Sequence, residues 1–153
     1  MPRKNRVQEI IENVAVIDIA DDGRAVGKAG DLAIFISHAV PGDVVDVKVT
    51  RKRRRYVETV PVRFSKYSQW RVEAFCTHFA VCGGCKWQDL EYNRQLFFKH
   101  KNVSDCFTRI GKLIYPDISP VVAAEPTTYY RNKLEFTFSS NRWLTDDDIQ
   151  SEC

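Results

Sequence analysis

Three of the chain's five cysteines lie within ten positions, in the segment CTHFAVCGGCKWQ. Cys76, Cys82 and Cys85 have the spacing C-x5-C-x2-C, with two glycines between the last pair. Thiolates must converge to hold a metal, and glycines let the backbone turn tightly enough for that. An iron–sulfur cluster takes four cysteines, and three close ones with a distant fourth are a common arrangement. Zinc also needs a fourth ligand, for which His78 is the nearest candidate, but it follows Cys76 too closely.

Two other roles are considered for these cysteines. A redox dithiol at Cys82 and Cys85 would usually accompany a βαβ pattern, which the sequence lacks. They could also be small buried residues without chemistry, although the spacing and the glycines favour a metal site. Cys106 falls on the apolar face of an expected helix and is predicted to lie in the core, whereas Cys153 is given no role.

The second chemical feature is a run of five consecutive basic residues. The net charge of +3 is mild, so the total does not by itself indicate an anionic partner. The run follows an expected strand, which places it at a hairpin end where a loop could present most of its cations to phosphates. Such binding weakens steeply with salt because counterions are released. The alternative is an ordinary solvated hairpin. The run comprises Arg51, Lys52, Arg53, Arg54 and Arg55.

Residues 1–64 have the pattern of a small β-barrel. VAVIDIA, LAIFIS, DVVDVKV and YVETVPV are strand candidates separated by turn signals. In DVVDVKV, alternation predicts that Val45, Val47 and Val49 face inward and that Asp46 faces water. Several short strands in about sixty residues indicate a closed barrel, because closure removes the exposed edges of a short sheet.

Residues 65–113 are interpreted as a cysteine loop followed by a helix. The helix is expected over 90–110, with Asp89 capping its start and Gly111 at its end. The apolar face predicted to pack comprises Leu96, Val103, Phe107 and Ile110.

Residues 114–153 contain one clear strand candidate, KLEFTF. About forty residues bury little core alone, so we expect this segment to be the start of a domain that the chain does not complete. No apolar stretch approaches the length of a membrane span. We therefore expect a cytoplasmic protein without membrane contact. We also expect it to be a monomer.

Three motifs in order resemble the bacterial RNA (uracil-5-)-methyltransferases. CTHFAVCGGCKWQDLEYNRQLFFKH resembles their iron–sulfur motif, in which C-x5-C-G-G-C is followed by Gln, Tyr, Gln-Leu and Lys. DDGRAVGKAGDLAIFISHAVPGDVVDVKV is similar to their TRAM domain, with Ala25 where a Gly is frequent and Ser37 where a Pro is. YYRNKLEF resembles the opening of their central domain. The matching residues after the cysteines are Gln88, Tyr92, Gln95, Leu96 and Lys99.

The resemblance implies a mainly β fold in three parts. An OB-like TRAM β-barrel that binds RNA would occupy 1–64, and the iron–sulfur cysteine loop and helix 65–113. The beginning of an α+β central RNA-binding domain would occupy 114–153. It also implies a 4Fe–4S cluster on Cys76, Cys82 and Cys85, with the fourth ligand expected beyond this chain.

The resemblance further implies that the full enzyme transfers a methyl group from S-adenosylmethionine to C5 of uracil in 23S ribosomal or transfer RNA. In the family, a later Rossmann-like domain binds that cofactor and carries the cysteine that adds to C6 of uracil. The chain shows neither the Gly-rich turn of such a domain nor that cysteine. No catalytic or S-adenosylmethionine-binding residue is therefore assigned, and whether this chain is itself an enzyme is left open.

The expected partner is RNA, and small barrels of this type bind single strands through a basic groove and stacking aromatic residues. Tyr56, Phe35 and Trp70 are the candidate stacking residues, although Phe35 lies in an apolar run and is expected in the core. Besides the basic run, Arg131 and Lys133 are candidate RNA contacts. Two alternatives are a stand-alone TRAM-type RNA-binding module and a zinc-binding regulatory protein.

Overall fold

The computed structural model describes residues 9–129 together with 133, 135, 138–142, 144 and 148. The chain divides into two compact units, Met1–Val121 and Val122–Cys153. The barrel and the helix described below belong to the first unit. Arg131, Cys153 and half of the strand expected at KLEFTF lie outside the described residues.

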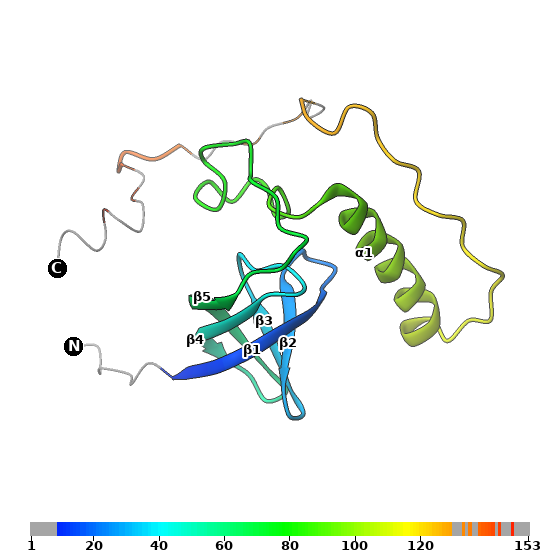
Figure 1. Ribbon diagram of the computed structural model, residues 1–153, viewed down its shortest axis with the longest axis horizontal. Coiled ribbons are helices and arrows are strands. Elements are labelled where there is room, and N and C mark those ends of the chain that lie inside the picture. The colour runs from blue at the N-terminus through cyan, green and yellow to red at the C-terminus, as the bar shows by residue number, and fades with distance from the viewer. Residues whose placement is uncertain are drawn as a thin grey trace. The chain divides into compact units, whose positions relative to one another are not determined.

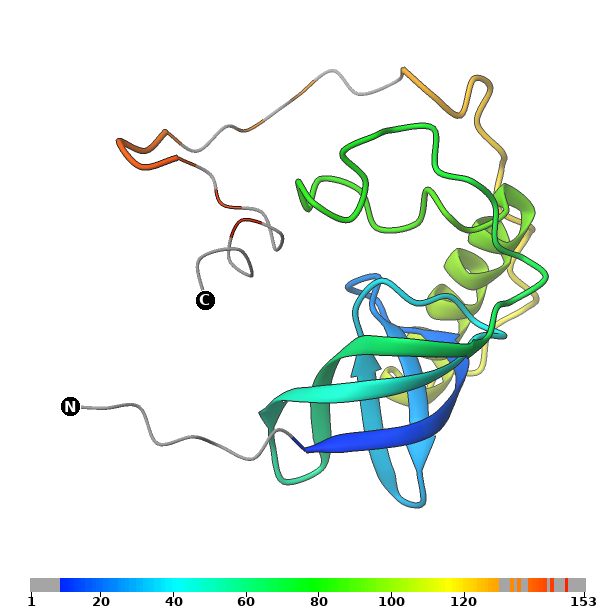
Figure 2. The ribbon, with the colours of Figure 1, turned by 60° about the vertical axis from the view of Figure 1, so that its left-hand side comes forward.

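Five strands close into a barrel (Figures 1 and 2). Strand β3 pairs with β5 in parallel, and the other neighbouring strands pair antiparallel in the order β1-β2-β3-β5-β4. Closure leaves the sheet without a free edge. The predicted mainly β fold with a small closed barrel is confirmed. The strands are β1 (Ile10–Ile19), β2 (Ala25–Ala29), β3 (Leu32–Ile36), β4 (Val44–Lys52) and β5 (Tyr56–Lys66).

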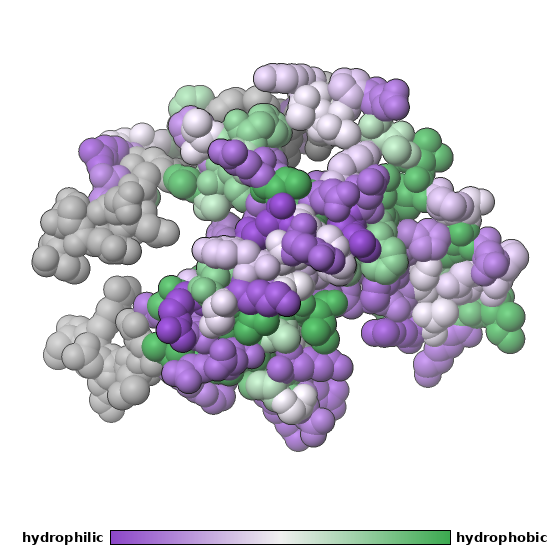
Figure 3. Space-filling view, in the orientation of Figure 1, coloured by the Kyte–Doolittle hydropathy of each residue, from purple (hydrophilic) through white to green (hydrophobic). Residues whose placement is uncertain are grey.

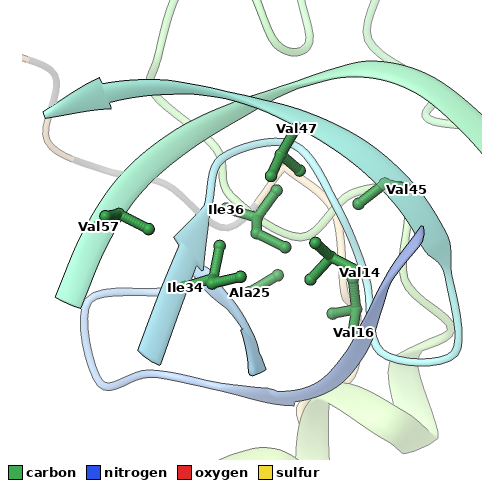
Figure 4. Packing of buried hydrophobic residues seen from close by; sticks show 8 residues of the cluster. All are labelled: Val14, Val16, Ala25, Ile34, Ile36, Val45, Val47 and Val57. Carbon is green, nitrogen blue, oxygen red and sulfur yellow. The ribbon is translucent and has the colours of Figure 1, made fainter. Parts of the chain in front are cut away.

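Aliphatic side chains fill the barrel interior (Figure 4). Val45 and Val47 are fully buried, as predicted, and Val49 packs against the same cluster. Each fully buried side chain of this size contributes about 1.5–3 kcal/mol relative to an exposed one. The barrel is therefore held by hydrophobic burial on the inward face of every strand. The buried cluster comprises Val14, Val16, Ala25, Ile34, Ile36, Val45, Val47 and Val57.

A bulge between β1 and β4 explains why Asp46 is buried rather than facing water as expected. Asn13 adopts a left-handed φ of 53°, and its N–H donates to Asp46 Oδ1 at 2.8 Å. Arg63 Nε donates to the other carboxylate oxygen at 2.8 Å. The hydrogen bond from the Asn13 N–H, reinforced by Arg63, lowers the pKa of Asp46. The carboxylate thus satisfies a backbone donor that the bulge releases from the sheet ladder.

One helix packs beside the barrel. It begins as α1 (Tyr92–Asp105) and continues into a π-helical turn, η1 (Cys106–Ile110). Phe98 is the side chain of α1 that is buried, and it joins a second apolar cluster between helix and barrel. Lys101 Nζ donates to Asp18 Oδ2 on β1 at 2.5 Å and to Asp105 Oδ2 at 2.8 Å. The second cluster comprises Ile19, Val40, Leu90 and Phe98, with Trp70 and Trp87 packed against it.

The predicted packing face of the helix is wrong. Val103, Phe107 and Ile110 are exposed, and Cys106 is exposed rather than in the core. The stripe through Phe98 and Lys101 faces the barrel instead, because those side chains reach the apolar cluster and Asp18. The described residues contain no helix with both the length and the hydropathy of a membrane span.

Candidate nucleic-acid interface and cysteine loop

The basic run occupies the β4–β5 hairpin. Strand β4 ends at Lys52, residues 53–55 make the turn, and β5 begins at Tyr56. The Arg53 N–H donates to the Tyr56 carbonyl at 2.9 Å and closes the turn. All five basic side chains are exposed. Figure 3 shows hydrophilic residues gathered at the barrel end that carries this hairpin and the β2–β3 hairpin.

Two of the five cations have acidic partners. Lys52 Nζ lies 3.1 Å from Glu9 Oε2, and Arg51 Nη1 lies 4.0 Å from Glu58 Oε2. Within residues 9–129 and the other described positions, no ion pair involves the side chains of Arg53, Arg54 or Arg55. The hairpin tip therefore presents three uncompensated charges to solvent.

An aromatic pair lies at the base of this hairpin. The expectation that Phe35 lies in the core is wrong: its neighbours Ile34 and Ile36 face inward, so Phe35 faces outward and is partly exposed. Its ring meets Tyr56 edge-on, with centroids 5.4 Å apart and an interplanar angle of 89°. The guanidinium of Arg24 lies 4.7 Å from the centroid of the Phe35 ring. Strict alternation through LAIFI was the sequence signal that could have placed Phe35 outside.

Acidic neighbours hold Arg24 in place. Its Nε donates to Asp22 Oδ2 at 2.6 Å, and its Nη1 lies 3.5 Å from Glu58 Oε1. Burial alone would lower the pKa of Arg24, but Asp22 and Glu58 outweigh it and raise the pKa. The guanidinium stays charged and positioned over the aromatic ring. The sequence gives no signal for the role of Arg24, because Phe35 and Glu58 become its neighbours only through the pairing of β2, β3 and β5.

Trp70, the third stacking candidate, has a different environment. It packs against the apolar cluster between helix and barrel, and the Arg94 guanidinium lies 4.2 Å from its ring centroid. Trp87 packs against the same cluster and donates from Nε1 to the Gly23 carbonyl at 3.0 Å. Both tryptophans therefore serve to join the cysteine loop and helix to the barrel.

A buried ion-pair network ties the same parts together. The Asp43 side chain is fully buried and accepts from the N–H groups of Val40 and Ser68, each at 2.8 Å. It also accepts from Arg71, with Nε at 3.0 Å and Nη2 at 2.8 Å. Arg71 Nη1 donates to Asp89 Oδ2 at 2.7 Å. Burial raises the pKa of Asp89, and the charge of Arg71 opposes that rise. Asp89 therefore anchors the loop rather than capping the helix as predicted, and Glu91 holds the cap position without a side-chain bond.

The cysteine loop carries its three thiols at or near the surface. Cys76 is partly buried, Cys82 and Cys85 are exposed, and all three are free thiols. Ala80 and Gly83 have left-handed φ values of 68° and 70°, which produce the tight turns expected of this segment. The Gly84 N–H donates to Cys82 Sγ at 3.5 Å, a contact of the kind that tunes cluster sulfurs.

The donor set of this loop suits a soft metal centre. Thiolates are the ligands of zinc and iron–sulfur sites. Among the residues that the structure describes, no three His, Cys, Asp or Glu side chains are grouped so that they could hold a metal ion. The three thiols share one loop, but the described structure does not group them as a metal site, so the predicted cluster stays a prediction.

The remaining predicted RNA contacts fall in the second unit. Lys133 is exposed, with its Nζ 2.9 Å from Glu135 Oε1. Arg131 lies outside the described residues, so its prediction stays a prediction.

Comparison with protein-family models identifies the barrel: the TRAM domain model matches residues 6–62. The barrel is a TRAM domain. This confirms the prediction made from its turn and strand motifs. The match covers four of the five strands entirely and most of β5, and it includes the arginine hairpin and the aromatic pair.

Most of the chain is also similar to proteins named RNA methyltransferases. It is 48% identical over 134 residues to an uncharacterized RNA methyltransferase of Bacteroides thetaiotaomicron, covering 88% of this chain and 30% of that protein. It is 42% identical over 135 residues to one of Porphyromonas gingivalis, covering 88% and 29%. It is 34% identical over 147 residues to the 23S rRNA (uracil(1939)-C(5))-methyltransferase RlmD of Xylella fastidiosa, covering 94% and 32%. The chain thus spans about a third or less of the length of these relatives.

Proposed function

We propose that this chain is the RNA-recognition and iron–sulfur portion of an S-adenosylmethionine-dependent methyltransferase that acts on C5 of uracil in 23S ribosomal or transfer RNA. The TRAM barrel and the names of the relatives support an RNA-binding portion of such an enzyme. The single observation that carries the proposal is the hairpin tip of Arg53, Arg54 and Arg55, which has no acidic partner among the described residues.

The hairpin would bind the RNA backbone. Arginine guanidinium groups form bidentate hydrogen bonds with phosphate oxygens, and three of them on one turn can follow successive phosphates. Each neutralised phosphate of a single strand contributes about 0.7 to the slope of log affinity against log salt. These contacts position the RNA but do not read its sequence. Lys133 and Arg131, from the second unit, are proposed as further backbone contacts.

The cysteine loop would hold three iron positions of a 4Fe–4S cluster through Cys76, Cys82 and Cys85. Among the described residues these three thiols are not grouped as a metal site and no fourth ligand joins them, so we propose that the fourth ligand comes from another segment of the full protein. The loop is fixed to the barrel through Trp87 and the Arg71 network. A bound cluster would tie this loop to the segment that supplies the fourth ligand, which is a structural role.

In this proposal, the methyl transfer is carried out by the part of a full-length enzyme, similar to the relatives, that this chain does not cover. S-adenosylmethionine would supply the methyl group there. The residues of this chain would bind and orient the RNA strand that carries the target uridine.

RNA binding is tested by fluorescence anisotropy with a labelled single-stranded RNA and the 153-residue chain. Replacing Arg53, Arg54 and Arg55 with Gln should weaken binding roughly 50-fold at about 0.15 M salt, if three phosphate contacts are lost. The matched control changes Lys99, Arg109 and Lys112 to Gln, which removes the same charge from exposed positions on and just after the helical segment. Equal losses for the two variants, or no RNA binding by the unaltered chain, would overturn the proposal.

The cluster is tested separately by anaerobic purification followed by iron, sulfide and zinc analysis. A brown protein that contains iron and sulfide supports the cluster, provided that the Cys82→Ser variant loses both the colour and the iron. A colourless protein with one equivalent of zinc would support a zinc site instead.

A further inference from the structure

The outer face of β2, β3 and β5 carries an aromatic surface whose role the phosphate contacts do not explain. Phe35 lies at its centre, because the strand register pairs it with Val26 on β2 and with Glu58 on β5. Tyr56 pairs with Ala33 one step along the same parallel ladder. Residues of small or moderate size thus surround two rings that meet edge to face. A partly exposed aromatic pair of this geometry offers ring surface that water solvates poorly.

Arg24 completes this surface and is already held in position. Its guanidinium lies over the Phe35 ring, and Asp22 and Glu58 fix its nitrogens. Because Asp22 and Glu58 restrain this side chain, little conformational entropy would be lost when a ligand stacks on it. A guanidinium is flat, weakly hydrated and stacks readily on aromatic planes. Proteins that bind unpaired RNA stack its bases on aromatic rings and on arginine planes.

The position of this surface relative to the arginine hairpin is decisive. Tyr56 follows Arg55 directly, and its carbonyl accepts the N–H of Arg53. The Ala33 N–H, two residues before Phe35 on β3, donates to the Arg55 carbonyl at 3.4 Å. The hairpin and the aromatic pair are therefore parts of one hydrogen-bonded corner of the barrel. An RNA strand whose phosphates contact the arginine hairpin therefore has a base within reach of the Phe35 and Tyr56 rings.

We propose that Arg24, Phe35 and Tyr56 form a stacking site for an unpaired nucleobase of the RNA whose flanking phosphates bind the hairpin. This inference rests on the proposed function and adds that the RNA is bound as a single strand. Bases in an A-form duplex are stacked on each other and are not available to such a surface. Positive charge beside an aromatic platform is the combination that single-strand-binding barrels use.

The first test compares Tyr56→Leu and Phe35→Leu with the unaltered 153-residue chain, using a uridine-rich single-stranded RNA and a duplex of equal length. Each substitution should weaken single-strand binding about 5- to 160-fold, the range for one stacked base, and leave the slope against salt unchanged. The matched control is Tyr67→Leu, which alters an exposed ring that lies just after β5 and stacks on Phe64. Circular dichroism checks that each variant remains folded.

The second test locates the base directly by photocrosslinking an RNA that contains 5-iodouridine and mapping the adduct by mass spectrometry. We expect adducts at Tyr56 or Phe35. Adducts confined to other residues, equal binding of duplex and single strand, or full affinity of both Leu variants would overturn the stacking site. If the stacking site is overturned but changing Arg53, Arg54 and Arg55 to Gln still weakens RNA binding, the proposed RNA-binding function stands without the stacking site. Failure of the unaltered chain to bind either RNA would overturn both.

Discussion

Replacing Asp43 with Asn tests whether the buried network holds the cysteine loop on the barrel. The carboxylate accepts four hydrogen bonds, two on each oxygen, from the N–H groups of Val40 and Ser68 and from Arg71. An amide keeps one oxygen and turns an NH2 group toward two of those donors. The substitution therefore breaks at least two buried hydrogen bonds and removes the charge that faces Arg71.

The expected loss of unfolding free energy is about 3 kcal/mol. Removing one partner of a buried pair costs about 3–5 kcal/mol. We take the lower end because the Arg71 side chain is 21% exposed and keeps Asp89 as a second partner. Small domains have only about 5–15 kcal/mol of stability, so a loss of this size shifts the unfolding transition clearly.

Urea denaturation followed by tryptophan fluorescence is the suitable assay, because Trp70 and Trp87 pack at the junction between barrel and helix. The matched control is Asp31→Asn, which makes the same chemical change at an exposed position in the β2–β3 turn. We expect the control to change stability by less than about 0.5 kcal/mol. The reasoning is refuted if Asp43→Asn is as mild as the control.

Three further predictions concern the barrel and its junction with the helix. A Cβ at Gly27 would lie 2.5 Å from Val14 Cγ1, so Gly27→Ala should lower the free energy of unfolding, measured by thermal denaturation, by about 1–3 kcal/mol. Its control is Gly30→Asn, at an open position with φ of 58°, which should have little effect. The Asn13 N–H and Arg63 lower the pKa of Asp46, so its stabilisation is present above the ordinary Asp pKa of about 3.9 and is lost as the pH falls through the lowered value. Urea midpoints of the unaltered chain and Asp46→Asn should therefore differ at pH 7 and converge in acid; a constant difference would contradict this. Lys101→Met should cost about 0.5–1 kcal/mol in urea denaturation, and high salt should shrink that difference.

Local patterns in the sequence were sufficient to predict the barrel. Alternation in DVVDVKV placed Val45 and Val47 inside, and turn signals separated the strands. The same reasoning failed for Phe35, because an apolar run was interpreted as core although alternation assigned its middle residue to the outside. It also failed for Asp46, because the bulge at Asn13 depends on the pairing between two distant strands.

The helix shows a second limit of sequence reasoning. Periodicity identified a helix but not which stripe faces the barrel, since Phe98 is buried against Ile19 and Val40, which are far from it in the sequence. Asp89 was interpreted as a local cap, whereas its partner is Arg71, 18 positions earlier in the chain. The basic run was visible as five consecutive cations in the sequence, but the three unpaired arginines could be told from Arg51 and Lys52 only when Glu9 and Glu58 were placed beside the strands. Ligand spacing predicted a metal site at the cysteines, and that site stays a prediction.

The salt dependence of RNA affinity tests the central claim most directly. Log affinity of the 153-residue chain for a single-stranded RNA should fall linearly with log salt. The slope should become shallower by about 2 when Arg53, Arg54 and Arg55 are changed to Gln, since each lost phosphate contact removes about 0.7. An unchanged slope in that variant would mean that the hairpin does not contact the RNA backbone and would contradict the account.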